Sequence, residues 1–245
     1  MSIACVGIGP GGGTDMTRRA LDALDAADVI VGYSTYVSLI RDAYPHKEFV
    51  STPMRGEVQR CERALELART GRSVALVCSG DPGIYGMAGL LIELAGRLCP
   101  TVEVEVIPGV TAANGGAAIL GAPLMHDWCS ISLSDLMTPW EVIERRLEAA
   151  AAADFCICLY NPSSHGRPHH LRRACDVLLR HLDEGTVCGM ARGVGRTDQE
   201  SIVLSLAELR EAQADMTTTV YVGNSQTRVV GGRMVTPRGY VLGDG

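Results

Sequence analysis

Three glycine-rich segments stand out as the residues most suited to holding a small molecule. They are residues 7–13, residues 79–86 and residues 108–113. Each follows a short hydrophobic run rich in Val, Ile and Leu, which is typical of a buried strand. Ligands of open parallel sheets bind beyond the carboxyl ends of the strands. The three segments therefore predict a small-molecule site made largely of backbone groups.

The first segment also satisfies the GxGxxG pattern of dinucleotide sites, with glycines at Gly7, Gly9 and Gly12. Such a site usually has an acidic residue at the end of the second strand to bind the ribose, but this strand ends in Val-Gly-Tyr at residues 31–33. Pro10 also removes a backbone N–H from the supposed phosphate cradle. A nicotinamide-linked oxidoreductase and a plain structural turn remain alternatives, and we favour a different small-molecule site.

The elements that must position these loops are alternating strands and helices. Strands are predicted at residues 3–6, 29–31, 74–78 and 102–107, with helices at residues 16–27 and 111–120. Thr14 or Asp15 is expected to cap the first helix. Strands connected by helices form parallel pairs, so an α/β lobe with a mostly parallel sheet is predicted for residues 1–121.

A second α/β lobe is predicted for residues 122–245, because the strand–helix alternation pauses at residues 121–123. Its strands are expected at residues 129–133, 155–160, 186–190 and 218–222, with helices at residues 139–150 and 167–181. Residues 228–230 and 234–235 flank Gly231-Gly232, which predicts a hairpin and a mixed sheet. A single eight-fold barrel is the rival fold.

Composition restricts the class of protein. The chain is 47% hydrophobic and 20% charged, with a net charge of −6 and a pI of about 5.5. These values argue against nucleic acid or an anionic membrane as partner. The amino terminus lacks the basic region of a signal peptide. The nine cysteines include no CxxC pair, so reduced thiols in the cytoplasm are expected, with Cys156 and Cys158 packed in the core.

Taken together, the segments GIGPGG, GDPGIYG and PGVTAA resemble those of the tetrapyrrole (corrin/porphyrin) methylase family in order and spacing. The resemblance covers the whole chain. It implies two α/β lobes with S-adenosyl-L-methionine bound in the cleft between them, a tetrapyrrole substrate and a homodimer. It also implies the following cofactor-binding residues: Pro10, Ser79, Gly80, Asp81, Tyr85, Thr111, Ala112, Tyr160, Asn161 and Ala191.

Within the family, residues 159–163 and 131–140 most resemble those of the precorrin-3B C17-methyltransferases and of their counterparts that act on cobalt-factor III. This implies methylation of carbon 17 with contraction of the macrocycle, giving precorrin-4. The sequence does not distinguish a metal-free from a cobalt-containing substrate. A protein that binds the cofactor as a sensor without turnover is a further alternative.

The chemistry of such a substrate suggests further candidates. A tetrapyrrole carries several carboxylates, and arginine pairs well with carboxylates. The candidates for this role, all in or beside predicted loops, are Arg55, Arg167, Arg192, Arg196 and Arg228. Ring contraction needs proton transfer, for which the candidates are Asp135, His126, His165 and Asp81. Asp135 has a competing structural role as a cap of the helix near Pro139.

Three histidines, His165, His169 and His170, lie close together in the sequence. Such a group could bind a metal, but the adjacent Gly166 and Pro168 indicate a loop that enters a helix. We therefore predict exposed or substrate-contacting histidines and no metal held by the protein.

Overall fold

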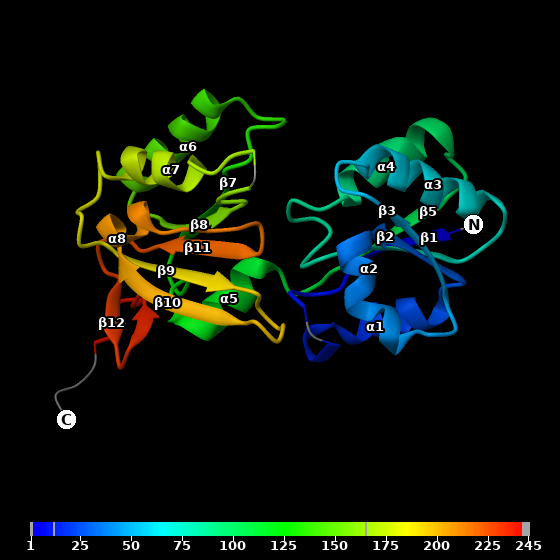
Figure 1. The fold of residues 1–245 in the computed structure, drawn as a ribbon, viewed down its shortest axis with the longest axis horizontal. Coiled ribbons are helices and arrows are strands. Elements are labelled where there is room, and N and C mark those ends of the chain that lie inside the picture. The colour runs from blue at the N-terminus through cyan, green and yellow to red at the C-terminus, as the bar shows by residue number, and fades with distance from the viewer. Residues whose placement is uncertain (1, 12, 165, 242–245) are drawn as a thin grey trace. The chain divides into compact units, whose positions relative to one another are not determined.

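The computed structural model describes residues 2–11, 13–164 and 166–241. The chain forms two compact units, which divide between Ala112 and Ala113. The boundary expected from the sequence follows Gly121, at the end of α5 (Ala112–Leu120). The boundary after Gly121 stays a prediction of where the second lobe begins. Figure 1 shows the elements of both units.

The amino-terminal unit contains a five-stranded sheet with the order β3-β2-β4-β1-β5. Its strands are β1 (Ser2–Gly7), β2 (Val29–Tyr33), β3 (Glu48–Thr52), β4 (Val74–Cys78) and β5 (Glu103–Ile107). Every pairing between them is parallel, which confirms the predicted parallel sheet. The sequence analysis missed β3, an edge strand that mixes polar and apolar residues and has no fully buried residue.

Helices cover both faces of this sheet (Figure 1). Helices α1 (Arg18–Ala26) and α2 (Ser34–Ile40) pack on one face, and α3 (Glu57–Arg69) and α4 (Ala88–Leu98) pack on the other, each pair around its own apolar core. Short 3-10 helices occur at Gly13–Asp15 and Arg41–Ala43. The expected cap of α1 is wrong: Thr17, not Thr14 or Asp15, accepts the hydrogen bond from the Ala20 amide.

The carboxyl-terminal unit contains a mixed sheet, as predicted, with the order β10-β9-β11-β8-β7. Its strands are β7 (Trp128–Ser132), β8 (Cys156–Tyr160), β9 (Val187–Arg192), β10 (Glu200–Ser205) and β11 (Thr218–Val222). Only β7 and β8 pair in parallel within it.

The predicted hairpin forms as β12 (Arg228–Val230) and β13 (Arg233–Val235). The sequence analysis took this hairpin as part of the main mixed sheet, but the hairpin lies outside that sheet. It pairs instead with the short strand β6 (Gly121–Ala122) in a separate sheet.

The two faces of the mixed sheet carry different partners. Helices α6 (Trp140–Ala152), α7 (His170–Leu178) and α8 (Leu206–Glu211) share one core with one face. Residues of α5 pack on the other face against Tyr221 and Met234. Cys156 and Cys158 are fully buried in β8, as predicted, and all nine cysteines, each within the described ranges, are free thiols. Among the described residues, no helix is long and apolar enough to cross a membrane.

Candidate functional site

The three glycine-rich segments of the amino-terminal unit meet at the carboxyl edge of its sheet, because all five strands point the same way. Gly9 and Gly80 exchange backbone hydrogen bonds of 3.2 and 2.7 Å, which makes an antiparallel bridge just beyond β1 and β4. Both glycines have positive φ, at 72° and 66°, a conformation that costs glycine little. The bridge therefore depends on glycine at both positions.

A second contact joins the third segment to the other two with no room for side chains. A Cβ on Gly109 would lie 2.1 Å from the Gly80 carbonyl oxygen, and a Cβ on Gly7 would lie 2.6 Å from the Gly109 nitrogen. Such distances are far below van der Waals contact. Glycine is required here because backbone packs directly on backbone, and the result is a rigid edge made of main-chain groups.

Asp81 locks two of these segments together. Its Oδ1 accepts a hydrogen bond of 2.7 Å from the Gly83 amide, and its Oδ2 accepts one of 3.1 Å from the Gly109 amide. Both carboxylate oxygens thus hold backbone groups of the edge. This arrangement favours a positioning role for Asp81 and disfavours the proton-transfer role considered from the sequence.

The remaining residues expected near a cofactor surround this junction. Pro10 is buried, and Ser79, Thr111 and Ala112 are half-buried in the segments that make the edge. Tyr85 is 53% exposed and has a positive φ of 54°, an uncommon conformation for a residue with a side chain. The structure therefore brings the seven predicted residues of this unit, Gly80 and Asp81 included, into one region.

Sequence reasoning missed Arg60, a buried arginine at the same edge, because a lone arginine in a helix gives no motif. Its guanidinium donates to Thr52 Oγ1 (2.7 Å), to the Pro53 carbonyl (2.9 Å) and to Met87 Sδ (3.2 Å). It thus ties the end of β3 to Met87, the residue that follows the second glycine-rich segment. Arg55 lies in the same turn, exposed and with a positive φ of 65°.

In the carboxyl-terminal unit, β7, β8 and β9 run in one direction, so their carboxyl ends share one edge of the mixed sheet. Tyr160 and Asn161 lie at the end of β8. The Tyr160 hydroxyl accepts a hydrogen bond of 2.9 Å from the Ala113 amide. Asn161 has a positive φ of 53° and donates to Ser132 Oγ at 2.9 Å. Ala191 is fully buried within β9 and pairs with Ser201 of β10 and Thr219 of β11, which disfavours the predicted contact of Ala191 with a ligand.

Asp135 follows β7 at this edge and contacts a histidine that sequence analysis did not pair with it. His170 Nε2 lies 3.0 Å from Asp135 Oδ2, and this interaction lowers the pKa of the Asp135 carboxyl. The proposed capping role of Asp135 is wrong, because Pro139 is the N-cap of α6 and no side chain caps that helix. The contact joins the end of β7 to the first turn of α7, and no local motif signals it.

His126 lies at the other end of β7, before its first residue Trp128. The five residues of that strand separate it from the carboxyl edge by about 16 Å, at about 3.3 Å per residue. It lines a separate pocket with Trp128 and Arg238. His126 is therefore unsuited to act with Asp135, and His165, the third candidate, lies outside the described residues.

The predicted substrate-binding arginines fall into two groups. Arg192 lies 2.9 Å from Asp215, 3.5 Å from Glu200 and 3.9 Å from Asp198, so its charge is already balanced by carboxylates. This setting disfavours the predicted role of Arg192. Arg228 lies on β12, in the separate small sheet.

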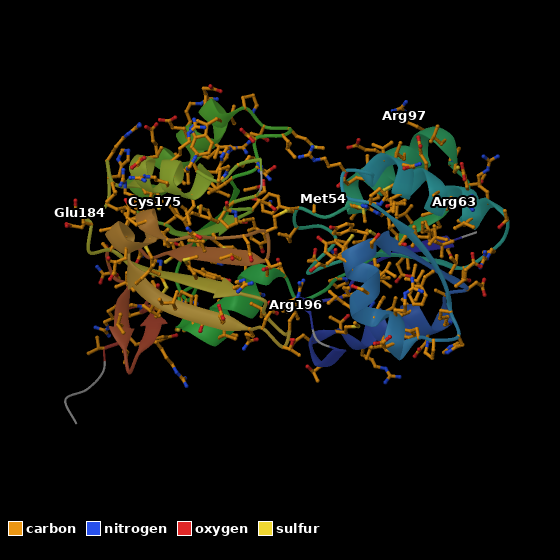
Figure 2. The ribbon with its side chains drawn as sticks, viewed as in Figure 1. Met54, Arg63, Arg97, Cys175, Glu184 and Arg196 are labelled. Carbon is orange, nitrogen blue, oxygen red and sulfur yellow. The ribbon has the colours of Figure 1, made fainter. Side chains whose placement is uncertain are left out.

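Arg167 and Arg196 differ from Arg192 in this respect. Arg167 Nη1 and Arg196 Nε are buried, and neither atom has a hydrogen-bond partner among the described residues. Arg196 lies in the loop after β9 and is labelled in Figure 2. A buried N–H without an acceptor costs about 1–3 kcal/mol, so both side chains gain free energy when an anion supplies that acceptor.

A metal site is not apparent among the described residues, since no group of three His, Cys, Asp or Glu side chains converges there. His169 is exposed, as predicted, whereas His170 is buried and contacts Asp135, so the expected exposure is wrong for His170.

Comparisons with known proteins identify the family. The sequence profile of the Tetrapyrrole (Corrin/Porphyrin) Methylases matches residues 2–210. A probable cobalt-factor III C(17)-methyltransferase from Salmonella typhimurium is 49% identical over 240 residues, which are 98% of this chain and all of that protein. A precorrin-3B C(17)-methyltransferase from Sinorhizobium sp is 40% identical over 228 residues, 92% of this chain and 89% of that protein.

Among solved structures, that of the methyltransferase CobJ superposes with a TM-score of 0.87 at 40% identity, covering 96% of this chain and 98% of that one. The match includes both predicted α/β parts. This chain therefore belongs to the tetrapyrrole (corrin/porphyrin) methylase family.

Proposed function

We propose that the protein transfers a methyl group from S-adenosyl-L-methionine to carbon 17 of a corrin precursor and contracts the macrocycle, within cobalamin biosynthesis. Precorrin-3B is the proposed substrate and precorrin-4 the product. The support comes from family membership and from the names of relatives that the chain covers almost completely. The bound cofactor supplies an activated methyl group on a sulfonium, so no covalent nucleophile on the protein is required.

One structural observation carries the cofactor assignment: the backbone junction of Gly7, Gly80 and Gly109 at the carboxyl edge of the parallel sheet. A rigid edge without side chains lets a flat, polar ligand approach the main chain closely. Pro10, Ser79, Tyr85, Thr111 and Ala112 are proposed to contact the cofactor there. Asp81 holds the edge in shape. From the other unit we propose Tyr160 and Asn161.

For the tetrapyrrole, we propose that Arg167 and Arg196 bind substrate carboxylates, because each has a buried nitrogen in need of an acceptor. Arg55 is a further candidate on account of its exposure. Asp135 is the proposed proton acceptor during ring contraction. Displacement at sulfur depends mainly on alignment, so the two steps rely on different residues.

Cobalt-factor III is a second candidate substrate, and the 49% identical relative from Salmonella typhimurium favours it. The same residues would serve either ring. The discriminating experiment is a single-turnover incubation of the protein and labelled S-adenosyl-L-methionine with each ring, followed by mass and absorption spectra. Gain of one methyl group and a changed chromophore with one ring identifies the substrate. Absence of methyl transfer to both would contradict the proposal.

Cofactor binding can be tested separately. S-adenosylhomocysteine should raise the melting temperature, because a ligand that binds only the native state stabilises it by about 2.7 kcal/mol at 100 times its Kd. NADH should have no such effect, and the opposite pattern would favour an oxidoreductase. Binding of S-adenosylhomocysteine with no turnover of either ring would favour a sensor. A cytoplasmic location and a homodimer complete the proposal, the latter testable by light scattering.

A further inference from the structure

The contact between Asp135 and His170 joins a partly exposed side chain to a buried one. The Asp135 side chain is 32% exposed, whereas that of His170 is 10% exposed, and His170 Nε2 lies 3.0 Å from Asp135 Oδ2. A carboxylate has about four lone-pair positions on its two oxygens. One oxygen faces the histidine, and the exposed part of the side chain leaves capacity for a ligand.

The imidazole of His170 is restrained by packing. Its ring packs edge-to-face on Trp140, with ring centroids 5.1 Å apart, and Trp140 is itself buried. The guanidinium of Arg173 covers the indole at 4.0 Å. His170 also belongs to the first turn of α7, so its backbone is fixed by the helix. The imidazole therefore holds its buried Nε2, which has no aligned hydrogen-bond partner among the described residues, at a nearly fixed position 3.0 Å from Asp135 Oδ2.

The charges around Asp135 favour its ionised form. His170 of α7 contacts it, and Arg167, in the segment after β8, contributes a positive charge nearby. The third packed element, α6, presents the uncharged Trp140. The amino terminus of α7 adds a partial positive charge. An ionised carboxylate accepts hydrogen bonds but cannot donate them, so its ligand must carry a donor.

We propose that His170 is a positioning residue that orients the Asp135 carboxylate to accept a hydrogen bond from a hydroxyl or ring N–H group of the tetrapyrrole. This inference rests on the proposed function and names the substrate groups that the edge of the mixed sheet recognises. Arg167, with its buried Nη1, is suited to an adjacent carboxylate of the same molecule. Asp135 would thus recognise hydrogen-bond donors of the ring, and Arg167 would recognise its carboxylates.

The test compares His170→Leu with His170→Gln. The leucine variant removes the polar ring nitrogens, whereas the glutamine amide places an N–H near the position of Nε2. We expect His170→Leu to raise the KM for the tetrapyrrole about tenfold, to change the rate of the methyl-transfer step less than threefold, and to leave the Kd for S-adenosylhomocysteine unchanged. We expect His170→Gln to restore the KM to within threefold of the wild-type value. His169→Leu, at the exposed neighbouring histidine, is the matched control and should behave as wild type.

Two further measurements separate positioning from a merely structural role. The Asp135 carboxyl carbon, followed by NMR, should titrate below the ordinary range of aspartate in the wild type and closer to that range in His170→Leu. Combining His170→Leu with Asp135→Asn should raise KM no more than Asp135→Asn alone, because histidine acts through the aspartate. Additive effects, or equal KM values in His170→Leu and wild type, would overturn the inference while leaving methyl transfer intact. A wild-type protein that methylates neither ring would overturn the proposed function and this inference together.

Discussion

The carboxyl edges of the two sheets are built in different ways. In the amino-terminal unit the edge consists of backbone packed on backbone, at Gly7, Gly80 and Gly109, with Asp81 as a brace. In the carboxyl-terminal unit the edge consists of paired side chains, such as Asp135 with His170 and Arg192 with Asp215. The first edge is rigid and tolerates few substitutions. The second is adjustable, and single substitutions there should alter affinity without loss of the fold.

The strongest test of this difference is Gly109→Ala. The new Cβ would lie 2.1 Å from the Gly80 carbonyl oxygen, and since both partners are backbone, whole segments must move. We expect a loss of about 3 kcal/mol or more in the free energy of unfolding, at the upper end of overpacking effects. S-adenosylhomocysteine should no longer stabilise the variant in thermal denaturation.

The matched control is Gly89→Ala in α4, where a Cβ meets nothing within 4 Å. Alanine in a helix is favoured over glycine by about 0.5–1 kcal/mol, so this variant should be as stable as wild type or slightly more so. Equal stability of the two variants would show that the backbone junction is not rigid.

The next largest effect is expected among the arginines of the second edge. Arg167→Ala should raise the KM for the tetrapyrrole about 10-fold to 100-fold, because a hydrogen bond to a charged group contributes about 1.5–3 kcal/mol. Arg192→Ala should leave the KM nearly unchanged, since Asp215, Glu200 and Asp198 already occupy its guanidinium. Steady-state kinetics of both variants at low salt decide this, and a larger effect at Arg192 would reverse the assignment.

The same difference explains what could be predicted from the sequence. The glycine-rich segments were recognisable because glycine is required at each close approach and the segments are contiguous. The pairing of Asp135 with His170 was not, because it depends on how β7 and α7 are brought together by the fold. Arg192 could not be distinguished from Arg167 for the same reason: its carboxylate partners come from β10 and from the turn before β11.

Asp81 is an intermediate case, because its side chain stabilises the edge that is built from backbone groups. Asp81→Ala removes the acceptor for the Gly83 and Gly109 amides. We expect a loss of about 1–3 kcal/mol in stability, the cost of leaving such groups unpaired, and weaker binding of S-adenosylhomocysteine in calorimetry. Asp81→Asn keeps one acceptor oxygen and should lose less. Unchanged stability and affinity in both variants would mean that the segments hold together without the brace.

The smallest effect concerns the pH dependence of the Asp215 cluster. Burial alone would raise the pKa of Asp215, but hydrogen bonds from Thr217, Thr218 and Arg192 outweigh burial and lower it. A carboxyl whose pKa is lower in the folded state stabilises the fold above its unfolded pKa of about 3.9, and this contribution is lost as the pH falls through the folded value. Asp215→Asn should therefore be less stable than wild type near pH 7, and the difference should shrink as the pH falls below about 4. The difference should stay below about 1 kcal/mol, because the Asp215–Arg192 pair is partly exposed.

Urea unfolding at a series of pH values measures this difference in stability. The control is Asp127→Asn, at a side chain that is 85% exposed. A difference between wild type and Asp215→Asn that is constant with pH would mean that the amide loses packing and not charge, and the second edge would then resemble the first.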